Sequence, residues 1–134
     1  MMDSISARVL LAEDNKANQR VSKAMLEKIG AEVDIAEDGQ QVLTLLAEKP
    51  YDLILMDCQM PVMDGFEATA AIRQLSDTPY HAIPIIALTA DVQQDTREKC
   101  EKVGMNDFLS KPFTFDKLIA TISRQLQAPR PAAD

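Results

Sequence analysis

The sequence is poor in the residues that hold small proteins together by metal ions or disulfides. Its 134 residues include one histidine, His81, and two cysteines, Cys58 and Cys100. A structural zinc site takes more histidine and cysteine ligands than this chain has. A chain of this length also buries enough surface to fold as one domain without a disulfide. We therefore expect free cysteines in a reduced, cytoplasmic setting.

Long apolar runs and an excess of basic charge are missing as well. No stretch approaches the ~20 apolar residues that span a bilayer, and residues 1–8 lack the apolar segment of a signal peptide. The chain carries 14 basic and 21 acidic residues, a net charge of -7. A domain that binds nucleic acid or an anionic membrane uses the opposite sign, so we expect direct contact with neither. The hydrophobic share of 46% and the charged share of 26% indicate a folded globule and exclude a disordered chain.

Short apolar runs alternate with helical patterns along the whole chain. The runs predict five strands, at residues 8–12, 32–36, 53–56, 85–88 and 108–109. Helices are predicted at residues 15–29, 39–49, 64–75, 92–103 and 114–127, with a loop at 77–79 and a flexible tail or linker at 128–134. Three strands are continuously apolar, as parallel strands covered on both faces are, whereas 32–36 alternates and suits an edge. This predicts a doubly wound α/β domain over residues 1–127, with a parallel five-stranded sheet.

Apolar spacing also predicts which side chains face the core. In the first helix Val21, Met25 and Ile29 share one face. Cys58 and Cys100 are interpreted as small packing residues. His81 is interpreted as a surface loop residue without a partner.

Polar residues follow four of the five predicted strands. Glu13 and Asp14 follow the first, Asp57 the third, Thr89 the fourth and Lys111 the fifth. The carboxyl ends of parallel strands meet at one edge of a sheet, which is where ligands bind in this class of fold. We therefore expect one shallow pocket with three carboxylates, a hydroxyl and an ammonium.

Repulsion between the carboxylates decides what such a pocket can hold. At an effective dielectric constant near 20, two like unit charges about 4 Å apart repel by roughly 4 kcal/mol. The group must therefore raise its pKa values or bind a hard divalent cation, and Mg²⁺ prefers such oxygen ligands together with phosphate. Lys111 and Thr89 suit phosphoryl oxygens, and a carboxylate can be the nucleophile.

Each of these residues also has an ordinary structural interpretation. An aspartate after a strand, such as Asp57, is often a turn or cap residue. Asp14 or Asn15 can cap the first helix, Thr89 can be a strand-end threonine, and Lys111 a solvated loop residue. Their joint placement at the ends of four strands favours the functional interpretation.

Four segments resemble the receiver domain of two-component response regulators. They are LLAEDN at 10–15, LMDCQMPVMDG at 55–65, IALTA at 86–90 and DFLSKPF at 107–113. The resemblance runs from about residue 8 to 126, and the first two variants are more similar to receivers of hybrid sensor histidine kinases than to stand-alone regulators. It implies a flavodoxin-like fold with strand order 2-1-3-4-5.

The resemblance implies a role for each acidic residue of the pocket. Asp57 would be the phospho-acceptor, attacking phosphorus held on a histidine of a partner. Asp14, Asp57 and the backbone carbonyl of Gln59 would ligate Mg²⁺ (or Mn²⁺), with Glu13 acting through metal-bound water.

The remaining matched positions concern the phosphoryl group and the conformational switch. Lys111 would contact a phosphoryl oxygen. Thr89 would donate another hydrogen bond, together with the backbone N–H of Ala90. Phe108 holds the aromatic switch position, and the bond before Pro112 is a candidate cis peptide.

The resemblance also implies the partners and the kind of activity. A histidine kinase, a histidine phosphotransfer protein or both would donate the phosphoryl group. The fourth helix, fifth strand and fifth helix would form the readout face and allow a weak dimer. The domain would catalyse its own phosphorylation and dephosphorylation without being an enzyme in its own right. Within a longer chain it would be a cytoplasmic part of a sensor kinase.

Other functions remain open at this point. A stand-alone single-domain response regulator has the same motifs, and a degenerate receiver would serve only as a docking module. A phosphatase with an aspartyl nucleophile needs a second acid two positions after it, where this chain has Gln59. A flavin mononucleotide carrier needs a phosphate loop where Glu13 and Asp14 would repel the ligand.

Overall fold

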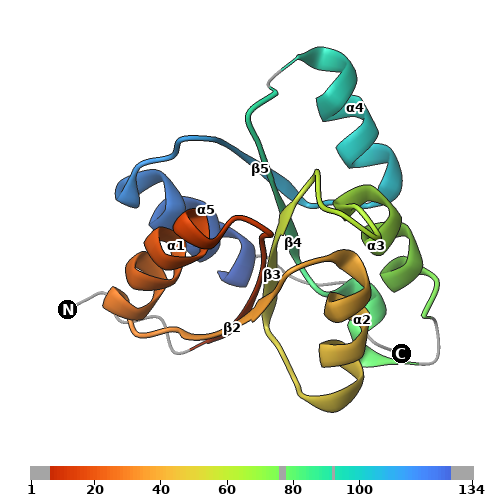
Figure 1. Cartoon of the computed structure of the whole chain (residues 1–134), viewed down its shortest axis with the longest axis horizontal. Helices are drawn as coiled ribbons and strands as arrows, with labels where there is room; N and C mark the ends of the chain where they lie inside the picture. Colours follow the sequence, from red (N-terminus) through yellow and green to blue (C-terminus); the bar gives the residue numbers. More distant parts are fainter. Residues whose placement is uncertain (1–6, 76–77, 92, 128–134) are drawn as a thin grey trace.

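Five strands and five α-helices alternate along the chain, as expected from the sequence (Figure 1). The computed structural model describes residues 7–75, 78–91 and 93–127, so the tail expected at 128–134 lies outside the described residues. The elements are β1 (Arg8–Ala12), α1 (Lys16–Lys28), β2 (Glu32–Ala36), α2 (Gly39–Glu48), β3 (Leu53–Asp57), α3 (Gly65–Arg73), the 3-10 turn η1 (Pro79–Ala82), β4 (Ile85–Thr89), α4 (Gln94–Val103), β5 (Asp107–Ser110) and α5 (Phe115–Gln127).

The strands form one parallel sheet in the order β2-β1-β3-β4-β5, which confirms the predicted topology. The pairing register aligns Ala12 with Met56, Asp57 with Leu88, and Thr89 with Ser110. The carboxyl ends of β1, β3, β4 and β5 therefore reach the same edge of the sheet. The expected edge strand, β2, lies at one side.

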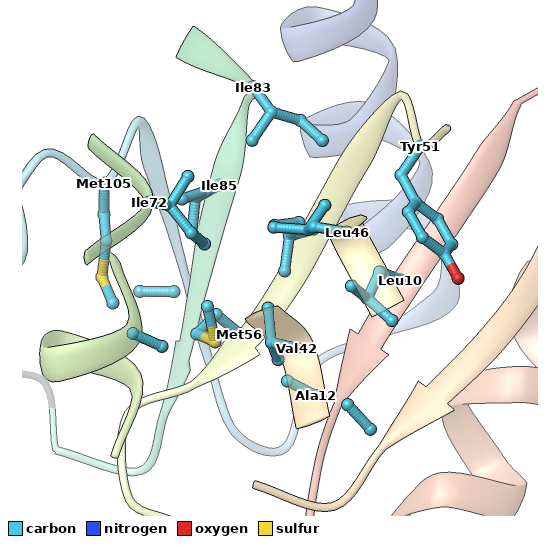
Figure 2. Packing of buried hydrophobic residues seen from close by; sticks show 14 of the residues in the cluster. Leu10, Ala12, Val42, Leu46, Tyr51, Met56, Ile72, Ile83, Ile85 and Met105 are labelled. Carbon is cyan, nitrogen blue, oxygen red and sulfur yellow. The ribbon is translucent and has the colours of Figure 1, made fainter. Parts of the chain in front are cut away.

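The two faces of the sheet are covered by different helices. Helices α1 and α5 lie on one face, and α2, α3 and α4 lie on the other (Figure 1). Successive side chains of a strand point to opposite faces, so Leu10 and Ile54 join the α2/α3 side while Val9 and Leu53 join the α1/α5 side. Figure 2 shows the first of these two buried clusters, with Val42 and Leu46 of α2 facing Leu10 and Met56.

Polar side chains cap the starts of α2, α3 and α5. Asp38 accepts a hydrogen bond from the backbone N–H of Gln41 (2.9 Å) at the start of α2. Asp64 and Glu67 form a capping box at the start of α3. Thr114 accepts from the N–H of Lys117 (3.2 Å) before α5.

The expected core face of α1 was wrong at one position. Val21 is 56% exposed, whereas Ile29 is buried and Met25 partly buried. The buried side of α1 also includes Gln19, whose side-chain amide donates to the carbonyl oxygen of Glu13 (2.6 Å). A polar side chain with a partner thus belongs to the core face, and Val21, two positions further along, points to the opposite, exposed side of the helix.

The expectation for His81 was also wrong. The predicted loop around it contains η1, in which His81 is partly buried. Its ring Nδ1 lies 3.0 Å from the carbonyl oxygen of Thr78, and its own carbonyl accepts a hydrogen bond from Arg73 (2.9 Å). Residue 77 of that loop lies outside the described residues, as does residue 92, where α4 was expected to begin.

Candidate functional site

Asp57 is the last residue of β3 and lies at the centre of the carboxyl edge of the sheet. Strands β1 and β4 flank it, and its side chain is largely buried. One carboxylate oxygen, Oδ1, accepts a hydrogen bond from the backbone N–H of Gln59 (3.1 Å). The other oxygen is left to face the neighbouring strand ends.

Glu13 and Asp14 leave β1 beside Asp57 but lie in different environments. Glu13 is 2% exposed, and its Oε2 accepts from the backbone N–H of Asn15 (3.2 Å). Asp14 is exposed. The cap of α1 is Asn15, whose side chain accepts from the N–H of Asn18 (2.9 Å), so Asp14 is not needed as a helix cap.

Lys111 brings one positive charge into this acidic edge. Its ammonium lies 2.7 Å from Oδ2 of Asp57 and 3.0 Å from Oε1 of Glu13. Burial alone would lower the pKa of Lys111, but the hydrogen bonds to the two carboxylates outweigh it and raise the pKa. Lys111 is therefore a permanent cation at neutral pH, shared between two acids from different strands.

The carboxylates are close enough to hold a cation in addition to Lys111. Glu13, Asp14 and Asp57 each offer an oxygen within 4.8 Å of the others. Burial, with the nearby Asp57 charge, raises the pKa of Glu13 against the lowering effect of Lys111. One ammonium against three acids leaves excess negative charge, and all the donors are oxygens, as Mg²⁺ prefers. The residues present thus fit a magnesium ion.

Thr89 ends β4 at the same edge, and its hydroxyl interacts with the following loop. Its Oγ1 accepts from the backbone N–H of Asp91 (3.0 Å). The Asp91 carboxylate in turn accepts from the hydroxyl of Thr96 (2.7 Å) and from the N–H of Gln93 (3.0 Å). A chain of hydrogen bonds therefore leads from the site to the first turn of α4.

An open cleft of about 300 Å³ joins these residues. The expected site residues Glu13, Asp14, Asp57, Gln59, Thr89 and Lys111 all line it, together with Ala90. Asn18 and Asp91 also line it, and neither was a site candidate from the sequence. Asn18 follows the α1 cap by three positions, a spacing that places it on the same end of the helix.

A second cleft, of about 340 Å³, adjoins the first and is mostly apolar. Val21, Met25, Pro112 and Phe113 supply its apolar wall, and Glu13, Asn18, Ala90 and Lys111 are common to both clefts. The Lys111–Pro112 peptide bond between the clefts is cis.

Phe108 lies outside the acidic cleft, on β5. Its ring is partly buried, and the guanidinium of Arg97 in α4 lies 5.2 Å from the ring centroid. The ring borders a cleft whose other walls include Lys117 and Arg124 of α5. The expected aromatic switch residue thus lies between α4 and α5, away from Asp57.

The two cysteines pack in the core, as interpreted from the sequence. Cys58 and Cys100 are both free and buried, and they belong to the cluster on the α2/α3 side. Burial raises the pKa of both thiols. Neither thiol reaches the acidic cleft.

Comparison with known proteins identifies the class to which this fold and site belong. The chain is a member of the response regulator receiver domain family, which matches residues 9–123. It is 43% identical over 129 residues to hybrid signal transduction histidine kinase B of Dictyostelium discoideum, covering 89% of this chain but 7% of that protein. The chain spans between 7% and 16% of the length of eight such relatives, seven of which are named as histidine kinases and the eighth as a hybrid signal transduction protein.

Solved structures agree with this assignment. The receiver domain of the sensor histidine kinase PA1611 from Pseudomonas aeruginosa has 42% identity and a TM-score of 0.83, covering 92% of this chain and all of that one; it holds a magnesium ion in its active site cleft. The chemotaxis protein CheY4 of Vibrio cholerae has 32% identity and a TM-score of 0.84, covering 90% of this chain and 99% of that one. No helix in the described part of this chain is long and apolar enough to cross a membrane.

Proposed function

We propose that this receiver domain accepts a phosphoryl group on Asp57 from a phosphohistidine of a partner protein, in a Mg²⁺-dependent reaction, and signals by changing conformation. Its place would be the receiver portion of a hybrid histidine kinase phosphorelay in the cytoplasm. The observation that carries the proposal is the contact of Asp57 Oδ2 with Lys111 (2.7 Å) inside a cluster of three carboxylates.

The transfer replaces one bond to phosphorus by another. An oxygen of Asp57 forms the new P–O bond, the P–N bond to the histidine breaks, and its electron pair stays on the imidazole. Both the nucleophile and the phosphoryl group are anionic, so their approach requires nearby positive charge. Lys111 supplies one such charge, and the Thr89 hydroxyl and the Ala90 N–H line the same cleft as further donors.

Magnesium fits the remaining need for positive charge. The carboxylates of Asp14 and Asp57 and the carbonyl of Gln59 would hold it, with Glu13 acting through a bound water. When bound, the ion supplies charge neutralisation for the acids and the phosphoryl oxygens. The magnesium ion of the PA1611 receiver supports this choice of metal.

The apolar cleft beside the site supports a protein as donor. A histidine kinase or histidine phosphotransfer protein would place its histidine over Asp57 while an apolar part of its surface covers Val21, Met25 and Phe113. Val21 is the most exposed of these three and gains most from being covered. Since both clefts share Lys111, docking and phosphoryl transfer would take place side by side.

A phosphorylation assay with paired variants tests the proposal. The protein is incubated with acetyl phosphate and Mg²⁺, or with a panel of phosphorylated histidine donors, and acid-labile phosphate is measured. We expect about one phosphate per chain in the native protein and none in Asp57→Asn. The control, Asp38→Asn, makes the same chemical change at a helix cap, where asparagine serves as well. Undiminished incorporation in Asp57→Asn would exclude Asp57 as the acceptor.

A further inference from the structure

Helix α4 is buried unequally along its length. Gln94, Asp95, Arg97 and Glu98 in its first half are all exposed. The side chains that enter the core come at the other end, where Cys100 is 3% exposed and Met105, just beyond the helix, is 7% exposed. Figure 2 shows Met105 beside Ile72 in the buried cluster. In Figure 1 the first turn of α4 lies at the rim of the molecule.

Surface contacts hold the first half of α4. The N-cap residue Gln93 makes no side-chain capping bond. Thr96 donates to the Asp91 carboxylate (2.7 Å), and the guanidinium of Arg97 lies over the ring of Phe108 (5.2 Å from its centroid). Such exposed contacts are individually weak, so this half of the helix can move at little cost.

Arg73, the last residue of α3, holds the opposite end of α4. Its Nε and Nη2 both donate to the carbonyl oxygen of Gly104, the C-cap of α4, at 2.9 and 2.7 Å. Its Nη1 donates to the carbonyl of His81 (2.9 Å). A guanidinium presents its donors in a rigid, planar fork, and positive charge is favoured at a helix C-terminus. The side chain thus fixes where α4 ends.

Asn106 connects this contact to the sheet. Its Oδ1 accepts from Arg73 Nη2 (2.7 Å) and from the backbone N–H of Ile85 at the start of β4 (2.8 Å). Gly104 fits the arrangement, because it has a φ of +106° and a β-carbon there would lie 2.9 Å from Cγ of Arg73. In the part of the chain that the structure describes, Arg73 has no acidic partner, and three of its four hydrogen bonds go to Gly104 and Asn106 at the end of α4.

We infer that Arg73 is a positioning residue that pins the C-terminal end of α4, so that phosphorylation of Asp57 swings the first turns of the helix about Gly104. The inference rests on the proposed function, since the swing starts at the phosphorylated site. Thr89 is tied through Asp91 to Thr96, in the first turn of α4. When Thr89 turns toward a phosphoryl group it leaves the Asp91 N–H, and the change reaches the weakly held end of the helix first.

Amide hydrogen exchange, read residue by residue, tests this pivot. The native protein is compared with and without Mg²⁺ and beryllofluoride, a phosphoryl mimic. We expect the mimic to change exchange at residues 94–97, while the amides of Gly104 and Met105, which donate to carbonyls of the last turn, stay unchanged. This comparison needs no variant, and an equal change along the whole helix would overturn the pivot.

Variants then assign the pivot to Arg73. Arg73→Met keeps an apolar stem but removes the donors, Arg73→Lys keeps the charge, and Lys102→Met removes an exposed cation from the last turn of α4 as the matched control. We expect exchange at Gly104 and Met105 to become about tenfold faster in Arg73→Met and newly sensitive to the mimic. Arg73→Lys should recover part of the protection, and the control should match the native protein.

The two proposals fail in different ways. If the native protein incorporates no phosphate and shows no response to beryllofluoride, the proposed function is wrong. If it incorporates phosphate and responds, but Arg73→Met exchanges at Gly104 as the native protein does, only the role of Arg73 is wrong. Phosphate incorporation itself should be the same in Arg73→Met and Lys102→Met. If Arg73→Met does not fold, the native comparison and Arg73→Lys still decide the matter.

Discussion

Gly65 approaches the backbone of Asp57 so closely that a β-carbon at Gly65 would lie 2.3 Å from the Asp57 carbonyl oxygen. The N–H of Gly65 donates to the carbonyl of Cys58 (3.1 Å), which turns the chain back over the end of β3. Every side chain larger than hydrogen must therefore shift the backbone at Gly65 or at Asp57, the residue that we propose as the phospho-acceptor. The glycine serves the geometry of the site without contributing a functional group.

Replacing this glycine should impair both stability and phosphorylation. We expect Gly65→Ala to lower the free energy of unfolding by roughly 1–3 kcal/mol through overpacking and to slow phosphate incorporation. The control is Gly30→Ala, which places alanine at a φ of +95° far from Asp57 and should cost about 1 kcal/mol. Urea unfolding and the acid-labile phosphate assay measure the two effects. Native phosphorylation kinetics in Gly65→Ala would contradict the prediction.

Lys111 should be dispensable for binding magnesium but required for the conformational response. Lys111→Met removes a cation that competes for Asp57 and Glu13, so calorimetry should show Mg²⁺ affinity no weaker than in the native chain. The response of the two-dimensional amide spectrum to beryllofluoride should be lost, because the variant has no ammonium to contact the phosphoryl mimic. Lys23→Met, a change on α1, is the control. A full spectral response in Lys111→Met would refute this role.

Acid should remove part of the stability that Tyr51 provides. The Tyr51 hydroxyl donates to Asp34 (2.7 Å) and lowers the pKa of that carboxyl below its ordinary value of 3.8. A lowered folded-state pKa adds stability above the unfolded pKa, and this stability is lost as the pH falls through the folded-state pKa. Since the Asp34 side chain is 33% exposed, we expect a contribution of about 1 kcal/mol.

Tyr51→Phe should therefore be less stable than the native protein at pH 7 and closer to it at pH 3. The control is Tyr80→Phe, because the Tyr80 hydroxyl donates to a backbone carbonyl, which does not titrate (3.3 Å). Urea unfolding at the two pH values measures the difference. If the stability lost in Tyr51→Phe were the same at both, the Asp34 carboxylate would not be its source.

The two thiols should react only when the protein opens. Burial raises the pKa of Cys58 and of Cys100, so little thiolate is present at pH 8. In native buffer an aromatic disulfide reagent should label neither cysteine on the timescale that suffices for the urea-unfolded chain. Variants with a single cysteine, Cys58→Ala and Cys100→Ala, separate the two rates. We expect Cys100 on α4 to react before Cys58, which directly follows β3; rapid labelling of Cys58 would contradict this.

The sequence predicted most of the sheet, and it predicted which residues of the candidate site lie together, because parallel strands end at the same edge. The strands β3 and β4 each extend one residue further than predicted, so that Asp57 and Thr89 are their final residues and do not follow them. Both side chains still lie at the carboxyl edge of the sheet. Asn15 rather than Asp14 caps α1, a choice that composition alone left open because both residue types are good caps.

Features that depend on tertiary contacts were not predictable from the sequence. Val21 fits the apolar spacing of α1, but Gln19 is buried because its amide reaches a carbonyl at the end of β1. The contact of Arg73 with Gly104 joins residues 31 positions apart, and no local pattern encodes it. Asp91 looks like an ordinary loop acid until its links to Thr89 and Thr96 are seen.

The alternation of side chains along the strands has a consequence for how signals can evolve. The sheet separates two buried clusters, one packed against α1 and α5 and the other against α2, α3 and α4. Between the two buried clusters lie the strand backbones, which a change in volume on one side must displace to reach the other. The surface that would recognise a donor, around Val21 and Phe113, can therefore diversify while the side that carries α4 keeps its packing. Under the proposed function, specificity for the donor protein and the form of the conformational response would then be separately adjustable traits of one small domain.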